Sequence, residues 1–407
     1  MPRVCVAGLL AATILVAGCG SDKPPATRNQ PAGANQPAGA PLGRLEAPTL
    51  PAPWPGFGRD GEHRAVGTTT GPRSGHVLWK RDLEGPVVPG PAVGPGNTVY
   101  AASNAGMLHA LDGADGSDRW SYDGGGSYGV DLSTTPAVLP AGMVLWPGPC
   151  DALHALDART GKLCWRVGFA SQPLSPLVDG ERVYVQDAGG TLSALALRGS
   201  APPRRLWSLE LGTISYSSPA LGRRGTVYTA AGNTLFAVRD GRVAWRVRTG
   251  GLIETSPAVA SGGVVTIDSN DHTQYGVSPD GEVRWRYDIG DLTYSSAATT
   301  PDGLVYFGDH RGQVTALDAR TGRLRYRVIG QGRTASEKNV GVWTMPVVDA
   351  DHAVYFGTHL GHVHGFDARG RRLLDVDLGG VVDSYPALTA DGTLIVGSES
   401  GTLVALG

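Results

Sequence analysis

Three histidines lie close together in the segment THLGHVHGFD (358–367), namely His359, His362 and His364. Imidazole nitrogens are common ligands of zinc and other transition metals, so this group could in principle hold a metal ion. Yet the residue type at the position of His364 varies between internal repeats of the chain. The equivalent residues in other copies are His109, His154, Ser193, Phe236 and Val404. A position that accepts so many residue types is typical of a strand face on which the side chain is not constrained by function. We therefore predict no metal site.

Aspartates invite a catalytic interpretation, because paired carboxylates can act as general acid and base. Four of them recur in one repeated turn: Asp112, Asp157, Asp318 and Asp367. A catalytic pair should be unique to one place, whereas a residue repeated in every copy of a turn is explained by the turn. The sequence also lacks a Ser–His–Asp signature, a P-loop and a dinucleotide-binding glycine motif. We therefore predict no catalytic residues and no enzyme.

The turn that carries these aspartates organises the chain. Its clearest copy is ALDARTGKLCW (155–165), with looser copies at 110–120 and 316–326. The pattern predicts a strand end, a tight turn and a returning strand that carries Trp165. Asp157 can accept hydrogen bonds from the backbone of the turn, and Gly161 can adopt a positive φ at little cost. One hairpin has been used repeatedly.

The repeat has a period of about forty residues over the whole globular part. Its aromatic position is occupied in turn by Trp79, Trp120, Trp165, Trp207, Trp245, Trp285, Tyr326 and, as the weakest copy, Leu374. Each copy contains four short runs rich in Val, Tyr and Leu between Gly-rich turns, which is typical of four strands and hence of one propeller blade. After the run at 403–406 no fourth strand follows, but Val77–Lys80 has the Trp of a fourth strand.

These repeats predict an all-β fold, an eight-bladed β-propeller of four-stranded blades over residues 77–407. The N-terminal strand 77–80 is expected to complete the last blade and to leave no long open sheet edge. The hairpin motif, the eight copies and this closure resemble the PQQ-like (quinoprotein-type) β-propeller family, in which the turn is a tryptophan-docking motif that joins blades. The segment WPGFGRDGEHRAVG (54–67) resembles the lead-in of such propellers, and we assign 54–76 to it.

Two classes of function follow from this resemblance. In length the chain is similar to non-enzymatic, BamB-like lipoproteins, which implies a binding scaffold without a cofactor. The alternative is a quinoprotein dehydrogenase that uses PQQ and calcium. Such enzymes are generally longer and commonly carry two adjacent cysteines, whereas this sequence has no Cys-Cys pair. Glu254 or Asp383 could supply calcium oxygens, but no matching ligand set can be placed residue by residue.

Residues 1–19 read as an export signal, with Val16-Ala17-Gly18-Cys19 resembling a lipobox. Acylation of the Cys19 thiol would anchor the chain in a membrane, and the alternative is an ordinary secretory signal cleaved nearby. Residues 20–53 are rich in Pro, Ala and Gly and read as a disordered tether. The protein is expected on the outer face of the cytoplasmic membrane, or on the periplasmic side of an outer membrane in a Gram-negative cell.

The net charge of −2 gives no reason to expect a nucleic-acid partner. We expect a monomer that binds an envelope protein or a glycan. The position three residues before the Pro slot of each repeat should lie near the mouth of the central channel. From the fourth repeat on it offers aromatic faces and carboxylates: Tyr216, Glu254, Tyr294, Trp343 and Asp383. This set suits a sugar, a peptide or a planar ligand, although the aromatics could instead simply plug the channel.

Two loops that lead into this mouth are longer than the others, 124–132 and 330–343. Long loops on a rigid scaffold commonly carry binding, and the alternative is variation in the length of surface loops. The only cysteines of the globular part, Cys150 and Cys164, are both in the second repeat. Export favours a disulfide between them, while the expected hairpin register places them far apart. The sequence leaves both possibilities open.

Overall fold

The structure, a computed structural model, describes residues 44–45, 52–127, 134–330 and 340–407. The predictions of an export signal, of lipidation at Cys19 and of most of the tether concern residues outside these ranges. Within them the chain forms short strands and three single-turn 3-10 helices. These helices are η1 (Pro95–Asn97), η2 (Arg223–Gly225) and η3 (Ser261–Gly263). No helix among the described residues is long and apolar enough to cross a membrane.

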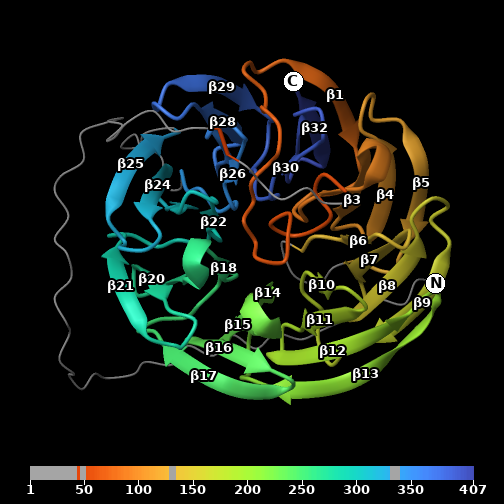
Figure 1. Cartoon of the computed structure of the whole chain (residues 1–407). Helices are drawn as coiled ribbons and strands as arrows, with labels where there is room; N and C mark the ends of the chain where they lie inside the picture. The colour runs from red at the N-terminus through yellow and green to blue at the C-terminus, as the bar shows by residue number, and fades with distance from the viewer. Residues whose placement is uncertain (1–43, 46–51, 128–133, 331–339) are drawn as a thin grey trace.

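Eight four-stranded antiparallel sheets stand around a central axis as the blades of a propeller (Figure 1). Blade 1 consists of β2 (Ala92–Val93), β3 (Thr98–Ser103), β4 (Met107–Asp112) and β5 (Asp118–Asp123). Blade 2 consists of β6 (Ala137–Leu139), β7 (Met143–Gly148), β8 (Ala152–Asp157) and β9 (Leu163–Gly168). Blade 3 consists of β10 (Leu177–Asp179), β11 (Arg182–Gln186), β12 (Thr191–Arg198) and β13 (Ala201–Glu210). Blade 4 consists of β14 (Ala220–Leu221), β15 (Val227–Ala231), β16 (Thr234–Arg239) and β17 (Arg242–Arg248).

The second half of the ring repeats the same order from the axis outward. Blade 5 consists of β18 (Ala258–Val259), β19 (Val265–Ser269), β20 (Thr273–Val277) and β21 (Val283–Asp288). Blade 6 consists of β22 (Ala298–Thr299), β23 (Leu304–Gly308), β24 (Gln313–Asp318) and β25 (Leu324–Ile329). Blade 7 consists of β26 (Val347–Val348), β27 (Val354–Gly357), β28 (His362–Phe366) and β29 (Arg372–Asp377). Blade 8 consists of β30 (Ala387–Leu388), β31 (Leu394–Gly397), β32 (Thr402–Leu406) and, from the other end of the chain, β1 (Val77–Asp82).

The pairing of β1 with β32 closes the ring, as the sequence predicted. The two strands run antiparallel, with Trp79 opposite Ala405 and Asp82 opposite Thr402. The closing strand is therefore two residues longer than the predicted 77–80. The second strand of every blade is buried almost throughout, while the outermost strands alternate between exposed and covered residues. The apolar core accordingly lies between neighbouring blades.

The repeated hairpin has the predicted geometry. Asp157 Oδ1 accepts hydrogen bonds from the amides of Arg159 and Thr160 at 3.2 and 2.8 Å, and Gly161 has a φ of 67°. The indole of Trp120 from the preceding blade lies against this glycine, so that an added Cβ would come within 2.6 Å of the ring. Its Nε1–H donates to the carbonyl oxygen of Ala158 at 3.0 Å.

A β-bulge sets the direction of Trp165, the corresponding tryptophan of blade 2. Leu156 pairs with Leu163 and Ala155 pairs with Trp165, so Cys164 is the extra residue between the two pairs. Such a bulge strengthens the local twist and redirects the next side chain, here toward the adjacent blade. No disulfide joins Cys150 and Cys164. The compartment argument for a bridge fails, because the register of β8 and β9 places Cys164 near the end of β8, whereas Cys150 lies in the turn before its start.

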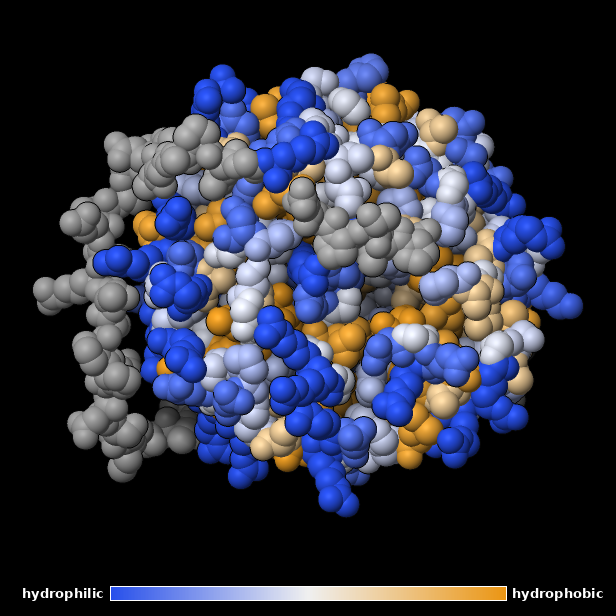
Figure 2. Space-filling view, in the orientation of Figure 1, coloured by the Kyte–Doolittle hydropathy of each residue, from blue (hydrophilic) through white to orange (hydrophobic). Residues whose placement is uncertain are grey.

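The lead-in segment crosses one end of the channel (Figure 1, orange). Its carbonyl groups accept hydrogen bonds from the innermost strands of six blades, namely blades 1, 2, 4, 5, 6 and 7. The amide-to-carbonyl pairs are Val138 to Pro55, Leu221 to Gly61, Val259 to Glu62, Thr299 to Arg64 and Val348 to Ala65. In blade 1, Trp54 and Val93 exchange two backbone hydrogen bonds of 3.1 and 2.7 Å. On the face seen in Figure 2, polar residues dominate the rim and apolar residues gather toward the middle.

Candidate binding site

The opposite end of the channel has an open mouth with a cavity of about 390 Å³. All five residues predicted from the repeat positions line this one cavity, although they come from five different blades and from separate loops. The described residues of its wall are Val88, Leu174, Tyr216, Ser218, Glu254, Tyr294, Trp343, His359, Asp383, Tyr385 and Glu399. Pockets of about 300–1,000 Å³ are the size that holds small ligands or single side chains of a partner.

The position of these side chains follows from the fold. Each lies in the segment that enters the innermost strand of a blade, just before β14, β18, β22, β26 or β30. The eight innermost strands surround the axis, so equivalent residues of successive repeats form a ring. Ser133, the equivalent of these residues in the second repeat, lies outside the described residues.

An aromatic cluster forms one side of the mouth. The ring of Tyr294 meets the edge of Trp343 at a centroid distance of 4.8 Å, and His310 stacks on Trp343 at 5.3 Å with an interplanar angle of 18°. His359 covers another part of the same indole at 3.6 Å. Packing on three sides fixes the orientation of Trp343. The indole Nε1 of Trp343 is buried and has no hydrogen-bond partner among the described residues.

Carboxylates form the rest of the mouth. Glu254 Oε2 accepts a hydrogen bond of 2.6 Å from Asn270, and Asp383 Oδ2 lies 3.2 Å from His359 Nε2. The other oxygen of Asp383 is buried and has no hydrogen-bond partner in the part of the chain that the structure describes. No lysine or arginine of the described chain lines the cavity. The described wall of the mouth is therefore acidic, and it holds an unsatisfied donor and an unsatisfied acceptor, which burial makes costly.

The pKa values of the two tyrosines of the mouth reflect its partial burial and its negative charge. Burial, and then the negative charge of Glu254, raise the pKa of both Tyr216 and Tyr294. Both hydroxyls accordingly remain protonated at neutral pH and can donate hydrogen bonds. Behind Glu254, burial raises the pKa of Asp268 well above its usual range, and its Oδ1 accepts a hydrogen bond from Thr255 at 2.5 Å.

Sequence reasoning did not assign Leu174, Ser218, His359, Tyr385 or Glu399 to the wall of the cavity, nor His310 to the support of Trp343. His310 and His359 occupy one shared turn position in their repeats, and this position lies beside the mouth. A comparison of the residues at this turn position between repeats would have identified both histidines. The two long loops that we predicted to carry binding fall mostly outside the described residues, at 128–133 and 331–339.

The three clustered histidines of the sequence are separated in space. His359 lies at the mouth, whereas His362 and His364 lie on β28, where they meet Asp375 of β29. These three side chains form the one group of histidine, cysteine and carboxylate residues in the described ranges that has the spacing of metal ligands.

Neither PQQ nor calcium fits the residues of the mouth. Calcium takes six to eight oxygen ligands, yet among the described residues Glu254 and Asp383 do not join a third such group at ligand distance. PQQ is a tricarboxylate, and it would face the carboxylates of Glu254, Asp383 and Glu399 without a described cation in the wall. Like charges at this range repel each other.

Comparison with known proteins agrees with the repeat architecture. BamB from Moranella endobia is 24% identical over 249 residues, which are 55% of this chain and 63% of that protein. The chain spans less than two thirds of the length of the first curated relatives that it matches.

Solved structures show the same fold. BamB from Moraxella catarrhalis superimposes with a TM-score of 0.65 at 20% identity, covering 81% of this chain and 98% of that one. A quinohemoprotein alcohol dehydrogenase from Comamonas testosteroni superimposes with a TM-score of 0.69 at 14% identity, covering 87% of this chain and 80% of that one. At such identities the superpositions show the fold and do not distinguish scaffold from enzyme.

The family model matches nearly the whole propeller. It is described as "Outer membrane protein assembly factor BamB", is built on PQQ-type repeats, and matches residues 64–129, 125–201 and 200–406. The chain therefore belongs to the BamB family of PQQ-like β-propeller proteins.

Proposed function

We propose that this protein is a lipid-anchored scaffold of the cell envelope that binds a cationic segment of a partner protein in the open mouth of its propeller. The observation that carries the proposal is the acidic, aromatic mouth at an end of the ring that the lead-in leaves open. Aromatic faces and carboxylates together suit a lysine or arginine side chain, through cation–π contact and charge pairing.

The unsatisfied groups of the mouth support a polar ligand. A peptide can offer a carbonyl oxygen to the indole Nε1 of Trp343 and an N–H group to Asp383 Oδ1, both of which lack a described partner. Satisfying buried groups of this kind contributes about 1–3 kcal/mol each. The names of the BamB relatives, which describe assembly factors of outer membrane proteins, support a protein partner over a glycan.

Site-directed photo-cross-linking in the full-length, membrane-bound protein tests this proposal. A photoreactive residue replaces Tyr216, whose side chain is 36% exposed at the mouth. In a control the same residue replaces Val243, which is 41% exposed on the outermost strand of blade 4. We expect a cross-linked partner from position 216 and not from 243, and an excess of a short lysine- and arginine-rich peptide should abolish it.

Competing ligands distinguish the proposed protein partner from a glycan partner and from an enzyme. Loss of the cross-link with an oligosaccharide, and not with the cationic peptide, would replace the protein partner by a glycan. Equal cross-linking from both positions would contradict a site at the mouth. Saturable binding of PQQ with calcium, together with dye reduction on addition of alcohols or sugars, would make the protein an enzyme and overturn the scaffold proposal.

A further inference from the structure

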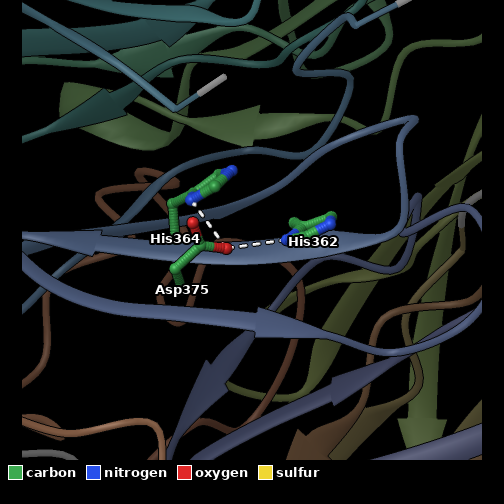
Figure 3. A group of neighbouring side chains, drawn as sticks. All are labelled: His362, His364 and Asp375. Carbon is green, nitrogen blue, oxygen red and sulfur yellow. Dashed lines mark hydrogen bonds and ion pairs between the residues drawn. The ribbon is translucent and has the colours of Figure 1, made fainter.

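A cluster of three potential metal ligands lies on blade 7 (Figure 3), and none of the three lines the mouth. His362 and His364 alternate along β28 and share one face, and Asp375 on β29 pairs directly with His364. Asp375 Oδ1 lies 2.7 Å from His362 Nδ1 and 3.5 Å from His364 Nδ1. The ligand atoms of the three residues all lie within 4.8 Å of one another.

Two imidazoles and one carboxylate are a ligand set of first-row transition metals. Around a tetrahedral zinc ion with bonds of about 2.0–2.1 Å, the ligand atoms are roughly 3.3–3.5 Å apart. The separation between Asp375 and His364 already has this value, the one to His362 is shorter, and all the ligand atoms lie within 4.8 Å of one another, so that side-chain adjustments would complete the coordination. Oxygen-preferring ions such as calcium and magnesium would not select this set.

The burial and the hydrogen bonds around the cluster favour a metal ion. His364 is fully buried, and its Nε2 has no hydrogen-bond partner in the described part of the chain. Arg372 donates to Asp375 Oδ2 at 2.7 Å, which leaves Oδ1 facing the imidazoles.

Other repeats of the chain provide an internal comparison. His109 and His154 occupy the position of His364 in blades 1 and 2, but the residues opposite them are Ser121 and Arg166. The residues two positions before them are Met107 and Ala152, where blade 7 has His362. A histidine at this position is therefore compatible with the fold alone, whereas in these three blades only blade 7 combines it with a second histidine and a carboxylate.

We infer that His362, His364 and Asp375 form a binding site for a divalent first-row transition metal ion such as Zn²⁺. The side chains of His362 and Asp375 are 25% and 29% exposed, so solvent reaches the open side of the site. An ion enters there and keeps water in its remaining coordination positions. The prediction of no metal site from the sequence did not include Asp375, which the cross-strand register brings opposite His364.

Titration of the metal-depleted full-length protein with Zn²⁺ in a calorimeter tests this inference, with Co²⁺ absorption in the visible range as a report on ligand geometry. We expect one site that is lost or weakened on the order of 100-fold in His362→Gln and in Asp375→Asn. His109→Asn is the matched control, because it changes the equivalent histidine of blade 1. It retains every other potential ligand, including the cysteine thiols, and should bind like the unaltered protein.

Unfolding curves accompany each titration. His362 is partly exposed, so His362→Gln should fold normally and decides the matter if Asp375→Asn does not fold. Zn²⁺ affinity that is the same in His362→Gln as in the unaltered protein would overturn the inference. So would an equal loss in His109→Asn, because binding would then not be specific to blade 7.

Discussion

The two ends of the ring are built from the same repeat but have opposite characters. At the sealed end, the backbone carbonyls of the lead-in accept hydrogen bonds from the innermost strands of six blades, and Trp54, Phe57 and Ala65 are buried there. At the open mouth, equivalent positions of successive repeats carry aromatic rings and carboxylates, and two of their polar atoms have no hydrogen-bond partner among the described residues. A segment outside the repeats thus stabilises one end of the ring, while side chains that differ between repeats form a candidate binding site at the other end.

Trp54→Ala should produce the largest effect. Trp54 is 3% exposed and pairs with Val93 through two backbone hydrogen bonds. Removing a buried tryptophan costs about 3–5 kcal/mol in the free energy of unfolding. Denaturant unfolding measures this loss, and ligand binding at the mouth of the folded variant should not change. A variant as stable as the unaltered protein would show that the seal does not hold the ring together.

The second-largest effect is expected on acidification, which should lower the free energy of unfolding through the sealed end. His63 is buried, and its Nδ1 lies 2.9 Å from the carbonyl oxygen of Pro257. Burial lowers the pKa of His63 to about 4, while a histidine in an unfolded chain has a pKa of about 6.5. The unfolded chain takes up the proton first, so stability falls as the pH falls from about 6.5 to about 4.

This loss amounts to on the order of 3 kcal/mol from His63. Chemical denaturation at a series of pH values measures it. His63→Gln should flatten the curve over this range without removing it, since burial also lowers the pKa of His154 and of His364 to about 4. An unchanged slope in His63→Gln would contradict the assignment.

Glu254→Gln tests the electrostatic character of the mouth. Its shape hardly changes, because the amide oxygen can still accept the hydrogen bond from Asn270. We expect about tenfold weaker binding of a cationic peptide, equal to about 1.4 kcal/mol, with an unchanged free energy of unfolding. Binding measured at low and high salt should show a smaller salt dependence in the variant. Equal affinity at all salt concentrations would exclude Glu254 from the site.

Asp268→Asn should give the smallest effect, and with the opposite dependence on pH to that of the sealed end. Burial raises the pKa of Asp268, so its contribution is present at acid pH and is lost as the pH rises through its pKa in the folded protein. Asparagine mimics the protonated form at every pH. The variant should therefore unfold at a slightly higher temperature than the unaltered protein at neutral pH. A lower unfolding temperature there would show that the carboxylate of Asp268 stabilises the fold.

The parts of the fold that repeat could be predicted from the sequence because each hairpin is fixed locally. Asp157 and Gly161 determine their turn within a few residues, and the same logic holds in every copy. The closure by strand 77–80 followed from counting strands. The parts that could not be predicted depend on contacts between distant segments. Examples are the strand register that separates Cys150 from Cys164, and the path of the lead-in across six blades.

The eight blades and the residues that face the mouth follow from the repeats of the sequence, because periodicity converts a position in the repeat into a position in the ring. Only the tertiary structure decided which side chains meet. It placed His359 against Asp383 at the mouth, and it placed Asp375 opposite His364 on blade 7. The physical reason is that cross-strand register and packing between blades join residues whose separation along the chain carries no signal of their contact.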